Sequence, residues 1–69
     1  MGDSRPEFKC GECVVARAYN KWEGNKYNRK ELPISFKVDK AILDEESREW
    51  YYYDRGEGYK VREEDILMN

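Results

Sequence analysis

The sequence predicts a small all-β domain, and three observations carry that prediction. Apolar and polar residues alternate with a period of two between Ile34 and Asp39, which is the pattern of a half-buried strand. Valine and aromatic residues, which favour strands, gather in short runs such as Cys13–Tyr19 and Trp50–Tyr53. Glycine, asparagine and proline residues, which favour turns, separate these runs. We therefore expect several short strands joined by turns.

The composition fits one small domain. Of the 69 residues, 39% are hydrophobic and 41% are charged, and the formal net charge is -2. A chain of this size buries only about 60% of its unfolded surface, so its stability is marginal. No apolar run approaches the roughly 20 residues that a membrane-spanning helix needs, and the polar residues 1–10 lack the apolar segment of a signal peptide. We therefore expect a cytoplasmic protein without a membrane partner.

The chain divides into a flexible N-terminal arm over residues 1–7, which is polar and contains Pro6, and a single domain over residues 8–69. The first strand is expected within residues 8–19, where small apolar side chains alternate. A long loop follows over residues 20–33, because Gly24, Pro33 and three asparagines favour turns. Loops of this length in compact domains are often functional.

The later elements form a regular series. They are a second strand at Ile34–Leu43, a third at Glu49–Asp54, a fourth at Tyr59–Val61, one turn of 3-10 helix at Arg62–Asp65 and a closing strand at Ile66–Met68. The alternation slips near Asp39, which predicts a bulge or bend. Four to five short antiparallel strands with two short hairpins predict a small SH3-like barrel, because closure removes exposed edges. A five-stranded OB-type barrel is the alternative, but it usually needs more residues and a helix.

Two short motifs resemble those of Tudor-type domains. The first is the run Gly11–Arg17 followed by Tyr19 and Trp22, and the second is Tyr53–Glu57 followed by Val61 and Asp65–Ile66. The resemblance implies a binding module in which an aromatic cage and an acidic or amide residue hold a methylated lysine or arginine. The positions that match such a cage are Tyr19, Trp22, Tyr53 and Asp54.

The aromatic run at 50–53 has two faces, because successive side chains of a strand alternate. We expect Trp50 or Tyr52 in the core and Tyr51 and Tyr53 outside. The outward tyrosines either shield the sheet or form a recognition surface with aromatics of the long loop. The residues predicted to bind a protein partner are Tyr19, Trp22, Tyr27, Tyr51, Tyr53 and Asp54.

The charge is unevenly distributed, with a net +3 over residues 1–40 and -5 over residues 41–69. Within the basic aromatic loop 21–30, bases could stack on the aromatic rings while phosphates meet basic side chains, as in single-strand binding. The residues of this possible nucleic-acid site are Lys21, Lys26, Arg29 and Lys30. The acidic half suits a basic protein surface, or it imitates a nucleic acid in a phage-type protein that occupies a host factor. A simpler alternative is that the basic and acidic side chains are solvated and form ion pairs with each other.

The residue types of the chain do not favour catalysis or metal binding. The chain has no histidine, and its two cysteines, Cys10 and Cys13, form one C-x-x-C pair. A zinc site usually needs four ligands, so one pair serves only in a site shared by two copies. The sequence therefore predicts a module that is not an enzyme, has no cofactor or metal, and is a monomer or weak dimer. Its expected partner is a protein, with nucleic acid as the alternative.

Overall fold

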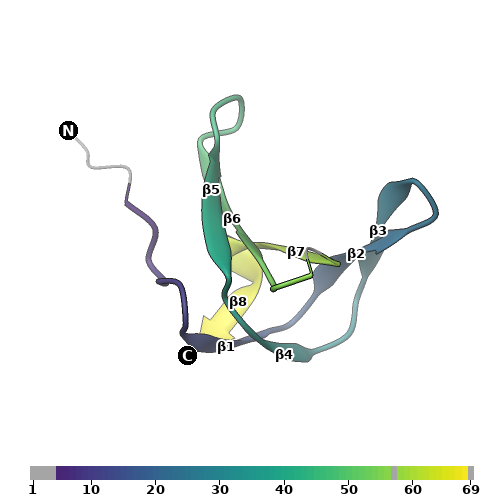
Figure 1. The fold of residues 1–69 in the computed structure, drawn as a ribbon, viewed down its shortest axis with the longest axis horizontal. Coiled ribbons are helices and arrows are strands. Elements are labelled where there is room, and N and C mark those ends of the chain that lie inside the picture. Colours follow the sequence, from purple (N-terminus) through teal and green to yellow (C-terminus); the bar gives the residue numbers. More distant parts are fainter. Residues whose placement is uncertain (1–4, 57, 69) are drawn as a thin grey trace.

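The computed structural model describes residues 5–56 and 58–68, and these residues form an all-β fold (Figure 1). Within them lie eight strands and one 3-10 turn, η1. The elements are β1 Cys13–Ala16, β2 Tyr19–Glu23, β3 Lys26–Lys30, β4 Ile34–Lys37, β5 Lys40–Asp44, β6 Glu49–Tyr53, β7 Tyr59–Arg62, η1 Glu63–Asp65 and β8 Ile66–Met68. The predicted 3-10 turn and closing strand are confirmed.

The strands form two antiparallel sheets. One has three strands in the order β4-β1-β8, and the other has five in the order β3-β2-β7-β6-β5. In Figure 1 the β2–β3 and β5–β6 hairpins project from the two ends of the larger sheet, with β1, β4 and β8 near their base. The two hairpins therefore lie at opposite ends of the larger sheet, and one side of this sheet contributes Tyr52 and Val61 to the core.

Residues from both sheets fill the core. Its members are Phe8, Val14, Ala16, Phe36, Val38, Tyr52 and Val61, all buried. The prediction that Trp50 or Tyr52 is a core residue is confirmed by Tyr52, which has no exposed surface. Trp50 is half-buried and packs against the core. Tyr51 and Tyr53, on the opposite face of β6, are both partly exposed.

The Tyr52 hydroxyl has its hydrogen bonds satisfied inside the protein. It accepts from the backbone N–H groups of Glu7 at 3.0 Å and Phe8 at 3.4 Å, and it donates to Glu63 Oε2 at 3.0 Å. The rings of Phe8 and Tyr52 meet edge to face with centroids 5.5 Å apart. Burial raises the pKa of Tyr52 to about 12. Tyr52 thus fixes the backbone where the predicted arm meets the domain.

The prediction of a closed barrel with four to five strands is wrong, because the described residues form eight strands in two open sheets. The predicted second strand is divided between the sheets. The N–H of Val38 donates to the carbonyl of Glu12 beside β1, whereas the N–H of Asp39 donates to the carbonyl of Tyr53 on β6, both at 2.8 Å. The bend predicted near Asp39 is therefore confirmed, and it moves the chain from one sheet to the other.

The prediction of a long loop over residues 20–33 is also wrong. Most of this segment forms the β2–β3 hairpin, which turns at Gly24 and Asn25. Gly24 has a φ of 70°, a left-handed conformation that glycine adopts without steric cost. The hairpin extends beyond the core, so its strands need no alternation of apolar and polar residues. Cross-strand pairing and a tight turn hold it together instead.

Candidate partner-binding surface

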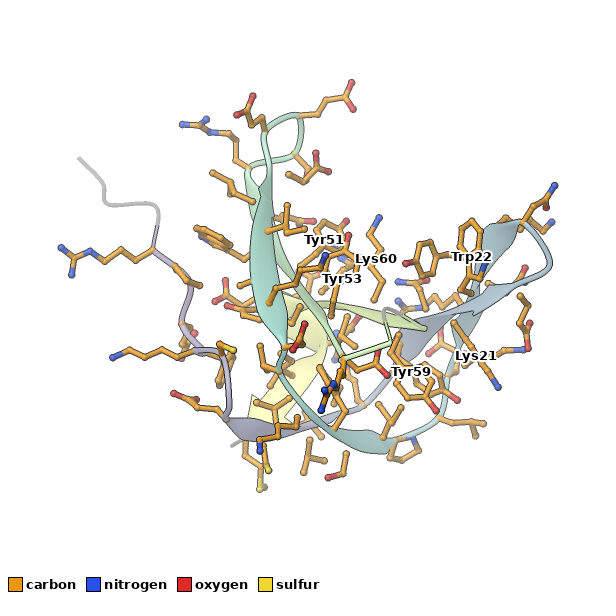
Figure 2. The ribbon with its side chains drawn as sticks, viewed as in Figure 1. Lys21, Trp22, Tyr51, Tyr53, Tyr59 and Lys60 are labelled. Carbon is orange, nitrogen blue, oxygen red and sulfur yellow. The ribbon has the colours of Figure 1, made fainter. Side chains whose placement is uncertain are left out.

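The register of the five-stranded sheet places several aromatic side chains on one face. Residues paired directly across neighbouring strands point to the same side of a sheet. Trp22 pairs with Tyr27, and Lys60 pairs with Tyr53. Figure 2 shows Tyr51, Tyr53 and Lys60 directed into the space between the two hairpins, with Trp22 on the far hairpin. We call this side the concave face, defined by Trp22, Tyr27, Lys40, Ile42, Tyr51, Tyr53 and Lys60.

Lys60 occupies the centre of the concave face. Its Nζ lies 4.7 Å from the centroid of the Tyr51 ring and 5.3 Å from that of Tyr27. Tyr51 belongs to β6 and Tyr27 to β3, so one ammonium group links the two hairpins through cation–π contacts. Lys40 makes a similar contact with Tyr53 at 5.9 Å. The face thus combines positive charge with flat apolar rings.

Part of this surface forms an open cleft of about 260 Å³. Its lining residues are Ile42, Leu43, Asp44, Glu45, Tyr51, Tyr53 and Lys60. The carboxylate of Asp44 is engaged in its own turn, where it accepts from the N–H of Glu46 and the hydroxyl of Ser47. Glu45 is exposed beside it. The cleft is therefore acidic toward the β5–β6 turn and basic toward Lys60.

Large apolar groups remain accessible around the cleft. Trp22 is 48% exposed and Ile42 is 45% exposed. The Trp22 ring meets Tyr27 edge to face at 5.0 Å. Burial raises the pKa of Tyr51, as does the neighbouring charge of Glu49, so its phenol stays neutral and able to donate a hydrogen bond at neutral pH.

The structure brings four of the six predicted partner-binding residues to the concave face, namely Trp22, Tyr27, Tyr51 and Tyr53. Tyr19 lies on the other side of the sheet, where its ring meets Tyr59 edge to face at 5.2 Å. Asp54 accepts a hydrogen bond from the N–H of Tyr59 at 3.2 Å. The positions that the Tudor-type resemblance assigns to a cage therefore do not share one face.

Three of the four basic residues proposed for nucleic acid lie on the opposite side of the sheet from the aromatic pair Trp22 and Tyr27. Lys21, Lys26 and Lys30 face away from Trp22 and Tyr27 in the register of the hairpin, and Figure 2 shows Lys21 on the opposite side from Trp22. Lys30 pairs with Glu23 at 3.2 Å. Lys21 and Lys26 are exposed. A strand stacked on the aromatic pair would not reach these lysines from the same side.

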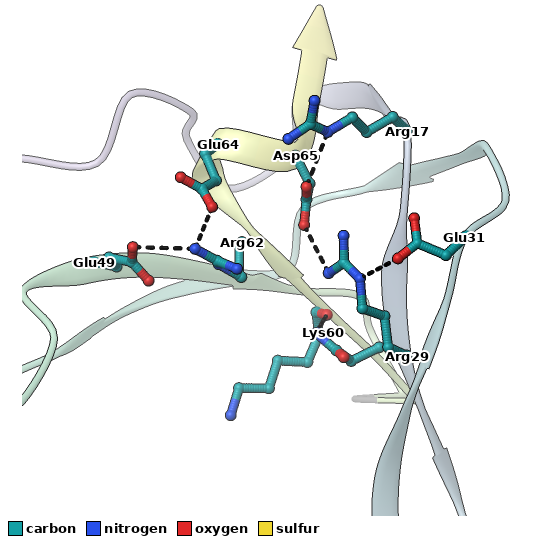
Figure 3. Close-up of polar contacts among 9 residues, drawn as sticks. Arg17, Arg29, Glu31, Glu49, Lys60, Arg62, Glu64 and Asp65 are labelled. Carbon is teal, nitrogen blue, oxygen red and sulfur yellow. Dashed lines mark hydrogen bonds and ion pairs between the residues drawn. The ribbon is translucent and has the colours of Figure 1, made fainter.

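The fourth basic residue of that set, Arg29, belongs to a cluster around the buried carboxylate of Asp65 (Figure 3). Arg29 Nη1 lies 3.2 Å from Asp65 Oδ2, and Arg17 Nε lies 3.1 Å from Asp65 Oδ1. Arg29 also pairs with Glu31 at 2.7 Å, and this pair and Asp65 raise its pKa. Burial alone would raise the pKa of Asp65, but the two arginines outweigh it and hold that pKa below its ordinary value. The cluster joins the β2–β3 hairpin to η1.

Sequence reasoning missed Lys60, although it lies at the centre of the aromatic group. The available signal was its place in β7 between Tyr59 and Val61, since a polar residue beside a core valine points to the other side of the sheet. That signal does not say which aromatics lie nearby, because Tyr27 is 33 positions earlier in the chain. Only the order of the strands brings the two residues together.

A second cleft, of about 390 Å³, is lined by Cys10, Gly11, Lys37, Val38, Asp39 and Arg55. Cys10 and Cys13 are free and exposed. Across residues 5–56 and 58–68, no group of three or more potential ligands among histidine, cysteine, aspartate and glutamate is arranged to hold a metal. This cleft therefore offers less defined chemistry than the concave face.

Comparisons with known proteins give no relative for this chain: no family model, curated protein or solved structure matches it. In the described part of the chain, no helix has the length and apolar character to cross a membrane.

Proposed function

We propose that this chain is a non-enzymatic binding module that recognises a protein partner through its concave face. The observation that carries the proposal is the grouping of Trp22, Tyr27, Tyr51 and Tyr53 around Lys60, on strands from both hairpins. Aromatic side chains are enriched at protein interfaces, since they contribute large contact areas and lose little conformational entropy on binding. A half-exposed tryptophan at the rim fits the role of an anchor.

The chemistry of the cleft supports binding more than catalysis. Its lining consists of phenols, aliphatic groups, one ammonium and carboxylates near the turn. Tyr51 has its pKa raised, which moves it away from the range of a general base at neutral pH. The two hairpins present these groups as a broad open surface, which suits a macromolecule better than a small substrate.

Two finer expectations belong to the same proposal. An SH3-like, Tudor-type relationship is suggested by the strand motifs, but the separation of Tyr19 from Trp22 favours a ligand other than a caged methylated side chain. A cytoplasmic location is suggested by the exposed, unpaired thiols of Cys10 and Cys13, since a reducing compartment keeps thiols free. A phage-type protein that occupies a host factor is one form this module could take.

A second candidate function is binding to single-stranded nucleic acid, and one observation favours it. Lys60 and Lys40 lie among the tyrosine rings, so stacking and phosphate contact are available on the same face. Affinity for a nucleic acid should then fall steeply between 50 and about 200 mM salt, because phosphate contacts release counterions. The acidic turn beside the cleft and the net charge of -2 favour the protein partner instead.

Photocrosslinking in cells of the native host tests the proposal. A benzophenone amino acid is placed at Trp22 or at Tyr51, and the matched control carries it at Ser35, which is exposed on β4 of the other sheet. We expect one protein to crosslink from both concave positions and not from Ser35. Crosslinks to nucleic acid alone, or equal crosslinking from all three positions, would contradict the proposal.

A further inference from the structure

Lys60, at the centre of the concave face, differs from several other basic side chains in how its charge is balanced. Several other basic side chains meet carboxylates: Arg17 and Arg29 at Asp65, Lys30 at Glu23, and Arg62 at Glu49. In the part of the chain that the structure describes, the ammonium group of Lys60 contacts two tyrosine rings and no carboxylate.

Aromatic rings hold an ammonium ion but do not neutralise it. The ring faces attract the cation through their quadrupole, and the ion keeps its full charge and its three N–H donors. Tyr51 and Tyr27 flank Lys60 at 4.7 and 5.3 Å and reduce its contact with water. A carboxylate that approaches from the open side therefore meets a positioned cation between apolar walls, where charge-assisted hydrogen bonds are strong.

We propose that the partner docks an extended segment in which a carboxylate side chain pairs with Lys60 and a neighbouring aromatic or aliphatic side chain packs against Trp22 and Tyr27. This inference rests on the proposed function and names the chemistry of the partner. The cleft beside Lys60, about 260 Å³ in volume, is wide enough for the side chains of a short segment and is bordered by the exposed Ile42.

The charges around the cleft favour a peptide over a nucleic acid. Asp44 and Glu45 line the end of the same cleft nearest the β5–β6 turn. A nucleic-acid strand carries a phosphate at every nucleotide, so it would bring negative charge to these carboxylates as well as to Lys60. A peptide places one carboxylate at Lys60 and a neutral or basic residue near Asp44 and Glu45. Such a charge pattern sets the direction in which the segment lies.

The test uses two synthetic peptides and NMR titration of the isotopically labelled full chain. The first peptide is Ser-Gly-Phe-Glu-Phe-Gly-Lys-Gly-Ser, and the second has Gln in place of Glu. We expect the Glu peptide to bind about tenfold more tightly, as loss of a charge-assisted hydrogen bond predicts. The shifted resonances should belong to Tyr51, Lys60 and Trp22.

Variants of the protein assign the effect to one side chain. Lys60→Met should lower affinity for the Glu peptide to that of the Gln peptide and leave the Gln peptide unchanged, whereas Lys60→Arg should keep the preference. Lys21→Met is the matched control, because Lys21 is exposed on the other side of the same sheet. Circular dichroism confirms that each variant is folded.

The outcomes separate this inference from the proposed function. Equal binding of the two peptides, weakened by Trp22→Ala, would overturn the role of the carboxylate and leave the protein-binding face in place. No binding of the Glu peptide would overturn the inference, while the crosslinking experiment would still test the proposed function. Binding of a ten-residue oligothymidylate in place of the peptides, with loss on Lys60→Met, would overturn both.

Discussion

Tyr51 and Tyr52 are neighbours on β6, yet their side chains lie on opposite sides of the sheet in different environments. On the core side, Tyr52 is fully buried and its hydroxyl contacts Glu7, Phe8 and Glu63. On the concave face, the partly exposed Tyr51 contacts the ammonium group of Lys60, which is held without a carboxylate in the described residues. On the core side the Tyr52 hydroxyl thus has its hydrogen-bond partners within the chain, whereas on the concave face the ammonium group of Lys60 can accept a carboxylate from a partner.

The largest expected effect is on the core side, at Tyr52→Ala. Truncation of a buried aromatic typically costs about 3–5 kcal/mol, close to the whole free energy of unfolding of a domain this small. We expect the variant to be largely unfolded by circular dichroism at 25 °C. The control is Tyr51→Ala, which should fold. If instead Tyr51→Ala unfolds and Tyr52→Ala does not, the assignment of the two sides is reversed.

A smaller loss of stability is expected for Asp65→Asn. An amide cannot accept charge-assisted hydrogen bonds from Arg17 and Arg29 as a carboxylate does, and each such bond to a buried group contributes about 1.5–3 kcal/mol. Both arginines keep part of their surface in water, so we expect a total loss of about 2 kcal/mol. Urea unfolding measures it. Glu31→Gln, at the exposed partner of Arg29, should leave stability nearly unchanged, and an equal loss there would contradict the role of Asp65.

Acid should weaken the same cluster. The folded-state pKa of Asp65 lies below its unfolded value, so its contribution is complete above an unfolded pKa of about 3.9 and is lost as the pH falls through the lower folded value. We expect the free energy of unfolding to fall below about pH 4. Urea midpoints between pH 7 and pH 2 measure this. Asp65→Asn should show a shallower acid dependence than the parent, and an unchanged dependence would exclude Asp65 as its source.

Tyr52→Phe should have a smaller effect than these, because it keeps the ring and removes only the hydroxyl. One lost hydrogen bond typically costs about 1 kcal/mol. The amides of Glu7 and Phe8 would lose their acceptor, so their hydrogen exchange should accelerate while amides of β7 change only with global stability. Unchanged protection of Glu7 and Phe8 would show that the hydroxyl does not fix this segment.

Much of the core side could be predicted from the sequence, because local pattern determines it. The alternation along β6 separates Tyr52 from Tyr51, and the phase slip near Asp39 locates the bend between β4 and β5. Both follow from the rule that strand neighbours point to opposite sides. The 3-10 turn and β8 also follow from short local motifs.

The concave face could be predicted only in part. The β2–β3 hairpin has few buried residues, so the burial pattern from which strands are inferred is missing there. The role of Lys60 depends on β7 lying between β2 and β6, and that order is a property of the whole fold. The prediction of a closed barrel was wrong for a related reason. Local sequence patterns identify strands, but they do not determine whether the edge strands β3 and β5 pair with each other.

The smallest effect on stability is expected at Trp22, which is why it is the sharpest test of the concave face. Trp22 is 48% exposed and its principal ring contact is with Tyr27 at 5.0 Å, a kind of pair that contributes about 0.5–1.5 kcal/mol. Trp22→Ala should therefore lower stability by no more than about 1 kcal/mol and keep the native circular dichroism, yet abolish capture of the crosslinked protein. Lys21→Ala, on the adjacent residue and the opposite side, should keep both. Thermal melts measured beside the capture assay decide the question. If Trp22→Ala unfolds the chain, the aromatic side chains of the concave face stabilise the fold, as those of the core side do, and the contrast between the two sides is wrong.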